Sequence, residues 1–303
     1  MKRNGRAWRL LLACLLLPWW PAASGADAVL RVAYAGSMGQ VMDVALGPEF
    51  ARAHALRWQG IGQGSYALAR LLAAGQMRAD VLVAITPGPM QVLRKAGLIR
   101  EAVPVASTRM VVVYSPRSRF AADFEAARRG DKPWYEVLQE PGLRLGRTDP
   151  AIDPQGANAL FSLQLAARFY QRPRLLQQIA GSLQNPRQMF AETSLMSRLE
   201  AGQIDATIGY YSAARSHRLP SIDLPPQIDL AHPDMQSRWY AHAGFTLADG
   251  KKFDAQPLVF YAAVLTTARN PQAARRFVEF LGSKPGQAQF RRHGYGPPHG
   301  PVL

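Results

Sequence analysis

The chain has 303 residues, with 48% hydrophobic residues, 36 Lys and Arg against 21 Asp and Glu, and one cysteine. This length can bury the core of one large or two medium domains. A single cysteine excludes a disulfide within the chain. The bases are scattered and form no run interleaved with aromatic residues, so we expect no nucleic-acid partner. The excess of bases either steers small anions or serves solubility alone.

The first 26 residues have the three parts of a secretory signal peptide. A basic start precedes an apolar run over 10–20, which is too short to span a bilayer, and small residues follow at 24–26. We predict export to the periplasm with cleavage after Ala26, which removes four bases and lowers the net charge from +15 to +11. Cys14 lies within the apolar run and superficially resembles a lipoprotein site, so lipid anchoring through Cys14 stays as an alternative.

Three turns in the first third of the mature chain combine small and hydroxyl residues. Each follows an apolar strand and precedes a helical pattern: Gly36-Ser37 after 29–34, Gly64-Ser65 after 55–58, and Thr86 after 80–85. Alternating strands and helices predict an α/β fold with mainly parallel sheets, in which loops at the carboxyl ends of strands share one edge. The glycine run over 60–64 lacks the Gly-Lys-Ser/Thr ending of a phosphate loop, so it predicts only a turn.

A stretch in the middle of the chain predicts a strand, a polar loop and a long helix. Leu143–Leu145 has the alternation of a strand edge, and Asp153-Pro154 has the cap and first residue of a helix that continues toward Tyr170. The free N–H groups of such a helix suit an anion. The alternative is that Asp153 only caps its helix. A crossing near Arg109 and a return near Tyr211 predict lobe I over 27–108 and 212–303, and lobe II over 109–211.

The sequence shows no signature of catalysis or metal binding. Its six His are dispersed, no His-Glu-x-x-His occurs, and no Gly-x-Ser-x-Gly elbow is present. We therefore expect no metal, no cofactor and no enzymatic activity. Hydroxyl-bearing turns and helix N-termini are instead the groups that hold an anion without changing it.

Short motifs along the mature chain resemble those of the molybdate/tungstate-binding proteins of ABC importers. In order, they are Ala35-Gly36-Ser37-Met38, Gly64-Ser65, Ala79-Asp80-Val81-Leu82, Arg109–Ser118, Asp153-Pro154-Gln155-Gly156, Gly202–Ala206, Tyr210–Ala214, Leu224–Leu230, Gln256–Tyr261 and Ala274–Leu281. Their order and spacing carry the resemblance from the first strand to the last helix.

The resemblance implies a two-lobed type II periplasmic-binding fold that holds an oxyanion in a hinged cleft. By match to the family's motifs, Ser37 and Ser65 are donors of the first lobe, Asp153 is the carboxylate of the site and Tyr210 is its tyrosine. Four neighbouring positions complete the predicted ligand-binding set: Gly36, Gly64, Thr86 and Gln155.

This chain also departs from the pattern that we expect of the family. Gly209 stands where we expect a metal-contacting Glu, Ala84 and Thr86 replace a Ser and an Asp, and Ala157 replaces an aromatic residue. A carboxylate pair can expand the coordination of the metal in the oxyanion, whereas Asp153 alone can hardly do so. The departures therefore favour binding by hydrogen bonds and leave the identity of the anion open.

We expect a monomeric, extracytoplasmic binding protein that delivers a small oxyanion to an ABC permease in the inner membrane. The alternatives are a binding protein for another small anion, a ligand sensor on the same fold, and an exported enzyme.

Overall fold

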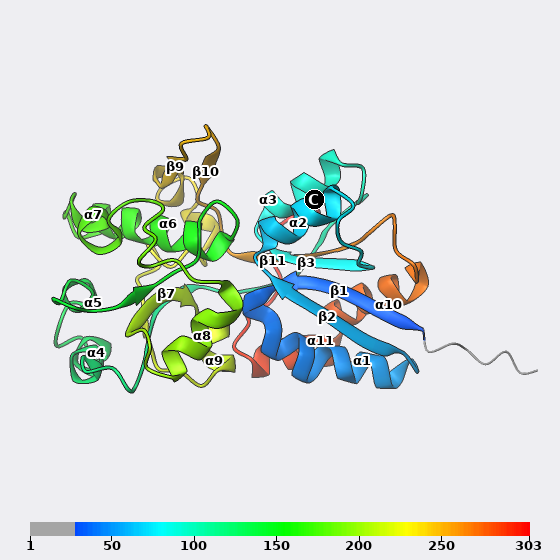
Figure 1. Ribbon diagram of the computed structural model, residues 1–303, viewed down its shortest axis with the longest axis horizontal. Helices are drawn as coiled ribbons and strands as arrows, with labels where there is room; N and C mark the ends of the chain where they lie inside the picture. Colours follow the sequence, from blue (N-terminus) through cyan, green and yellow to red (C-terminus); the bar gives the residue numbers. More distant parts are fainter. Residues whose placement is uncertain (1–27) are drawn as a thin grey trace, which may run out of the picture.

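The computed structural model describes residues 28–303, so the predicted signal peptide and Cys14 lie outside the described residues. Two lobes lie side by side, each built around one sheet (Figure 1). Within residues 28–303, no helix has the length and apolar character needed to cross a membrane.

The first sheet has five strands in the order β2-β1-β3-β11-β4. The strands are β1 (Val29–Ala35), β2 (Arg57–Gln63), β3 (Val81–Ile85), β4 (Val103–Ser107) and β11 (Val259–Val264). β1 pairs in parallel with β2 and β3, while β11 opposes both of its neighbours. Four of the five strands therefore run in one direction, as the alternating pattern predicted.

Helices cover both faces of this sheet (Figure 1). One face is covered by α2 (Ser65–Ala73) and α3 (Pro87–Lys95), and the other by α1 (Gly47–Ala53), α10 (Pro271–Gly282) and α11 (Lys284–Arg292). This double cover explains why every residue of β3 is buried and why that strand is continuously apolar. Between β1 and α1, the chain forms a 3-10 turn over Gly36–Met38 and a π-helix over Val41–Leu46.

The second sheet has four strands in the order β6-β7-β5-β8. They are β5 (Met110–Tyr114), β6 (Leu145–Gly146), β7 (Ala206–Tyr210) and β8 (Ser221–Asp223). β6 and β7 are parallel, and β5 runs antiparallel to β7 and β8, so this sheet is mixed. Its helices are α4 (Ala121–Arg129), α5 (Trp134–Val137), α6 (Pro154–Phe169), α7 (Leu175–Ala180), α8 (Glu192–Glu200) and α9 (Tyr211–Ser216).

The strand pairing returns the chain to the first sheet later than the expected crossing near Tyr211. β8 pairs with β5 in the second sheet. The hairpin of β9 (Gly244–Thr246) and β10 (Lys252–Asp254) packs against α6, where the rings of Phe161 and Phe245 lie 5.3 Å apart. The first sheet resumes only with β11. The chain therefore passes between the sheets after β4 and again before β11.

The glycine run is a strand and not the expected loop. Gly60 and Gly62 lie within β2, which pairs with β1, and both face the ring of Tyr34. A glycine at these positions leaves room for that ring. A Cβ atom on Gly62 would lie 2.8 Å from Cε2 of Tyr34. The turn itself begins only at Gly64.

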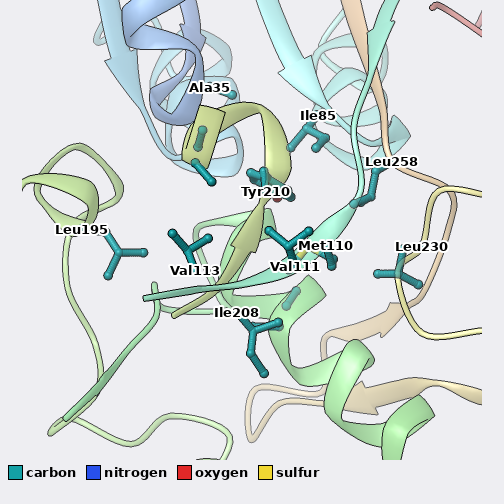
Figure 2. Close-up of a cluster of buried hydrophobic side chains, with 14 of the residues drawn as sticks. Ala35, Ile85, Met110, Val111, Val113, Leu195, Ile208, Tyr210, Leu230 and Leu258 are labelled. Carbon is teal, nitrogen blue, oxygen red and sulfur yellow. The ribbon is translucent and has the colours of Figure 1, made fainter. Parts of the chain in front are cut away.

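Buried apolar side chains continue from one lobe into the other. Figure 2 shows Tyr210 and Met110 of the second sheet with Ile85 of the first among these side chains. The rings of Tyr210 and Phe260 meet edge to face with their centroids 6.4 Å apart. The two sheets are therefore joined by packed side chains beside the predicted site.

Candidate functional site

The predicted site lies where the two sheets present loops to each other. On the first sheet, β1 ends at the turn with Ser37, and β2 leads through Gly64 to Ser65. On the second sheet, β6 leads to the loop with Asp153, and the parallel strand β7 ends at Tyr210. The expectation that turns after parallel strands share an edge is confirmed for β1, β2 and β3.

Asp153 has the role of helix cap that its sequence predicted. It precedes α6 with extended backbone, and its Oδ1 accepts a hydrogen bond of 2.8 Å from the N–H of Gln155. Its other carboxylate oxygen faces the opposite lobe, since a Cβ atom on Gly64 would lie 3.1 Å from Oδ2. The side chain is therefore both a cap and a wall of the cleft, and the two roles do not exclude each other.

Glu192 is a second carboxylate of the site that the sequence reasoning missed. It is the first residue of α8, and a Cβ atom on Gly36 would lie 2.7 Å from its Oε2. Both carboxylate oxygens are buried without a hydrogen bond of good geometry, although the Ser37 hydroxyl and the N–H groups of Gly36 and Ser37 lie nearby. The amphipathic pattern over 192–199 predicted the helix. It did not predict that the first residue of this helix, Glu192, would lie against Gly36 of the first lobe.

The hydroxyl groups of Ser37 and Ser65 also lack partners. Both oxygens are buried, and neither residue caps a helix through its side chain. Ser65 is the first residue of α2, and Gly64 holds the cap position. A buried polar group without a partner costs about 1–3 kcal/mol. Such hydroxyls are free to donate to a ligand, and that of Ser37 lies beside the Glu192 carboxylate.

Two tyrosines line the same region. Tyr210 is 1% exposed, and its hydroxyl accepts a hydrogen bond of 3.1 Å from Nδ2 of Asn158. Tyr295, which the sequence reasoning did not select, comes from the C-terminal tail, and its hydroxyl lies 3.5 Å from the carbonyl oxygen of Ser37. The tail reaches this position because Ser107 and Gly296 exchange backbone hydrogen bonds.

The two carboxyl groups are too deeply buried to ionise normally. Burial raises the pKa of Asp153 to about 7, although the hydrogen bond from the N–H of Gln155 opposes this effect. Burial also raises the pKa of Glu192, and repulsion by Asp153 raises it further. Two such groups titrate as a pair. The pair therefore retains protons at a pH where exposed carboxylates are ionised.

A small cavity and a larger one adjoin the carboxylates. The small one, of about 10 Å³, is lined by Ser37, Glu192, Tyr210 and their neighbours and has the volume of about one water. The larger one, of about 520 Å³, reaches Asp153 and Glu192 from outside, between Gly64 and Phe190. Among the described residues, no Lys, Arg or His lines either cavity. An anion here would meet hydroxyl, N–H and carboxyl groups instead of basic side chains.

Two other predicted residues have different surroundings. Thr86 lines a separate cavity of about 190 Å³ beside α3, which neither Asp153 nor Glu192 lines. The side chain of Gln155 is used within the second lobe: it accepts from the N–H of Thr148 at 2.9 Å and donates to the carbonyl of Ile208 at 2.7 Å. Gln155 thus fixes the loop that carries Asp153.

Asp153 has a second carboxylate beside it, which the sequence did not predict. Gly209 indeed has no side chain, and a Cβ atom there would face Thr207 and Gln155. Glu192 supplies the second carboxylate from α8 instead. The argument against direct coordination of a metal centre therefore no longer holds.

Two lobes with a buried polar site between them define a solute-binding protein of the type II periplasmic-binding fold. The chain belongs to the family of bacterial extracellular solute-binding proteins, whose model matches residues 30–296. A putative ABC transporter molybdenum-binding protein of Haloferax volcanii is 32% identical over 238 residues, which cover 77% of this chain and 72% of the relative. The molybdate/tungstate-binding protein WtpA of Pyrococcus abyssi is 29% identical over 62% of this chain, but the match spans only 59% of that relative.

Solved structures show the same fold at low sequence identity. The periplasmic molybdate-binding protein of Azotobacter vinelandii has a TM-score of 0.61 and 15% identity, over 89% of this chain and all (100%) of that one. The sulfate-binding protein SubI of Mycobacterium tuberculosis has a TM-score of 0.55 and 16% identity, over 89% and 86% of the two chains. At such identities the likeness concerns the fold and not the ligand.

Proposed function

We propose that this protein is the solute-binding component of an ABC importer and that it binds molybdate or tungstate between its lobes. The observation that carries the proposal is the buried pair of Asp153 and Glu192, beside which lies the unpartnered hydroxyl of Ser37. The names of the relatives from Haloferax volcanii and Pyrococcus abyssi support the same class of ligand.

A carboxylate pair distinguishes between oxyanions of similar shape. Above the raised pKa values of the pair, the ionised carboxylates repel sulfate or phosphate, whose central atoms accept no further oxygen ligand under these conditions. Molybdenum and tungsten centres accept additional oxygen ligands, and carboxylates suit hard metal centres. Asp153 and Glu192 would then approach the metal, while Ser37, Ser65 and nearby N–H groups donate to the oxo groups.

Binding would end in delivery and not in chemical change. The ligand enters through the larger cavity, closure of the lobes surrounds it, and the closed form is the one that a membrane permease recognises. We further propose that the protein acts in the periplasm after cleavage near Ala26.

A thermal-shift panel tests the ligand class. The purified mature protein is titrated with molybdate, tungstate, sulfate, phosphate and thiosulfate. A ligand at a hundred times its Kd adds about 2.7 kcal/mol to the free energy of unfolding. We expect a shift with molybdate and tungstate and none with sulfate or phosphate. An equal shift with sulfate would contradict the proposal.

Substitution of Glu192 tests the role of the carboxylate pair. Glu192→Gln keeps the size of the side chain but removes a charged ligand, so we expect tungstate affinity to fall at least about tenfold, or 1.4 kcal/mol. Glu136→Gln, at the exposed position of the otherwise buried α5, is the matched control. X-ray absorption of the bound metal should show more than four oxygen neighbours in the wild type. Four neighbours in the wild type would rule out direct coordination.

A further inference from the structure

Two hydrogen bonds connect α2 of the first lobe to the turn over 149–153 of the second. The N–H of Ala67 donates to the carbonyl of Ile152 at 3.2 Å. Nη2 of Arg70 donates to the carbonyl of Ala151 at 2.9 Å. Both acceptors are backbone atoms of the short loop that ends in Asp153.

The first of these bonds completes the start of a helix from the opposite lobe. Ala67 is the third residue of α2, and a first-turn N–H has no acceptor within its own helix. The carbonyl of Ile152 takes this place when the lobes are together. Opening of the cleft would return both groups to water.

The second bond places a charged donor beside the same loop. Arg70 is half-buried, and its guanidinium carbon lies 5.9 Å from the centroid of the Tyr66 ring. That ring meets Phe253 of the hairpin edge to face at 5.8 Å. Arg70 is therefore held against residues from both lobes.

The turn transmits its position to Asp153. Within it, the N–H of Ala151 donates to Oδ1 of Asp149 at 2.9 Å, and the N–H of Asp153 donates to the carbonyl of Asp149 at 3.0 Å. These bonds make the turn one small unit. When α2 holds the carbonyls of Ala151 and Ile152, it therefore also holds the Asp153 carboxylate against Gly64.

We propose that Arg70 is a positioning residue that keeps the cleft closed by binding the 149–153 turn, and that it thereby sets the lifetime of the bound ligand. The identity of that ligand rests on the proposed function, whereas the closing contact does not. Arg70 acts through the turn and Asp153, and it need not touch the oxyanion.

Small-angle scattering of the ligand-free protein tests the closing contact. Arg70→Ala is compared with wild type and with Arg94→Ala, which removes an exposed arginine from the neighbouring helix α3. We expect a larger radius of gyration for Arg70→Ala alone. Arg70→Lys keeps the charge and a donor, so it should recover part of the compaction.

Stopped-flow kinetics with tungstate test the lifetime. The loss of one hydrogen bond from a charged donor should raise the dissociation rate of Arg70→Ala about tenfold, with little change in association. Equal radii and equal dissociation rates for Arg70→Ala and Arg94→Ala would overturn the proposal. If the wild type binds no tungstate, the proposed ligand is wrong, and the scattering comparison still decides the role of Arg70.

Discussion

A Cβ atom on Gly36 would lie 2.7 Å from Oε2 of Glu192, so the missing side chain of this glycine provides the space for the carboxylate. Gly36→Ala should displace Glu192 and lower tungstate affinity about tenfold while the fold persists. Isothermal titration and circular dichroism measure the two effects. Gly39→Ala is the control, because nothing lies within 4 Å of a Cβ atom there. Equal affinities in the two variants would place the Glu192 carboxylate elsewhere.

Removing the unpartnered hydroxyls should separate affinity from stability. Ser37→Ala and Ser65→Ala each remove a buried oxygen without a partner, so the free energy of unfolding of the empty protein should stay equal or rise by about 1 kcal/mol. Affinity for molybdate should fall, because each variant loses a donor to the ligand. Urea denaturation and calorimetry measure the pair of effects. Ser197→Ala, on the exposed side of α8, should change neither.

The pKa of Asp153 predicts how stability depends on pH. Since the folded carboxyl titrates at about 7 against an ordinary value of 3.8, it holds a proton that the unfolded chain has released between these values. The folded state therefore binds more protons, and the free energy of unfolding of the empty protein falls as pH rises from about 4 to 7.

Asp153→Asn should reduce this fall. The difference between the folded and unfolded pKa values of Asp153 corresponds to a fall of about 4 kcal/mol in the free energy of unfolding if the cleft stays closed. The fall is smaller if the cleft opens and water reaches the carboxyl. Urea denaturation from pH 4 to 8 compares the variant with wild type and with Asp234→Asn, which changes an exposed carboxylate. If the free energy of unfolding changed with pH in the same way for wild type and Asp153→Asn, the Asp153 carboxyl would be ionised in the closed cleft.

Arg147 should stabilise the segment that leads to Glu192. It is 1% exposed, and its guanidinium donates to the carbonyls of Ser182 and Leu183 and to the side chain of Gln188. Burial lowers its pKa to about 10, so it stays charged at neutral pH. Arg147→Met should lower the free energy of unfolding by about 2–3 kcal/mol, because charged hydrogen bonds are lost.

Hydrogen exchange over 182–192 measures where Arg147→Met loosens the chain. We expect faster exchange there and weaker tungstate binding, because Glu192 lies at the end of this segment. Arg187→Met, an exposed position in the same segment, is the control and should leave both unchanged. Unchanged exchange over 182–192 in Arg147→Met would show that Arg147 does not stabilise this segment.

Local sequence signals predicted the elements that carry most of the site. The apolar run of β3, the Asp-Pro start of α6 and the small residues at the carboxyl ends of β1 and β2 depend on propensities and steric rules that act over a few residues. The Asp153 cap was therefore predictable, and the motifs around Ser37 and Tyr210 already resembled those of a known family.

Local sequence patterns did not predict three features of the structure: the second carboxylate, Glu192; the tyrosine of the tail, Tyr295; and the later return of the chain to the first sheet. Glu192 lies beside the candidate site because α8 packs its first residue against Gly36, and Tyr295 does so because the tail pairs with Ser107. The sequence by itself determined which turns carry polar groups and which family the chain resembles. Only the tertiary structure decided that two carboxylates meet those turns. The contacts of Glu192 with Gly36 and of Asp153 with Gly64 join residues far apart in the sequence, which only folding brings together.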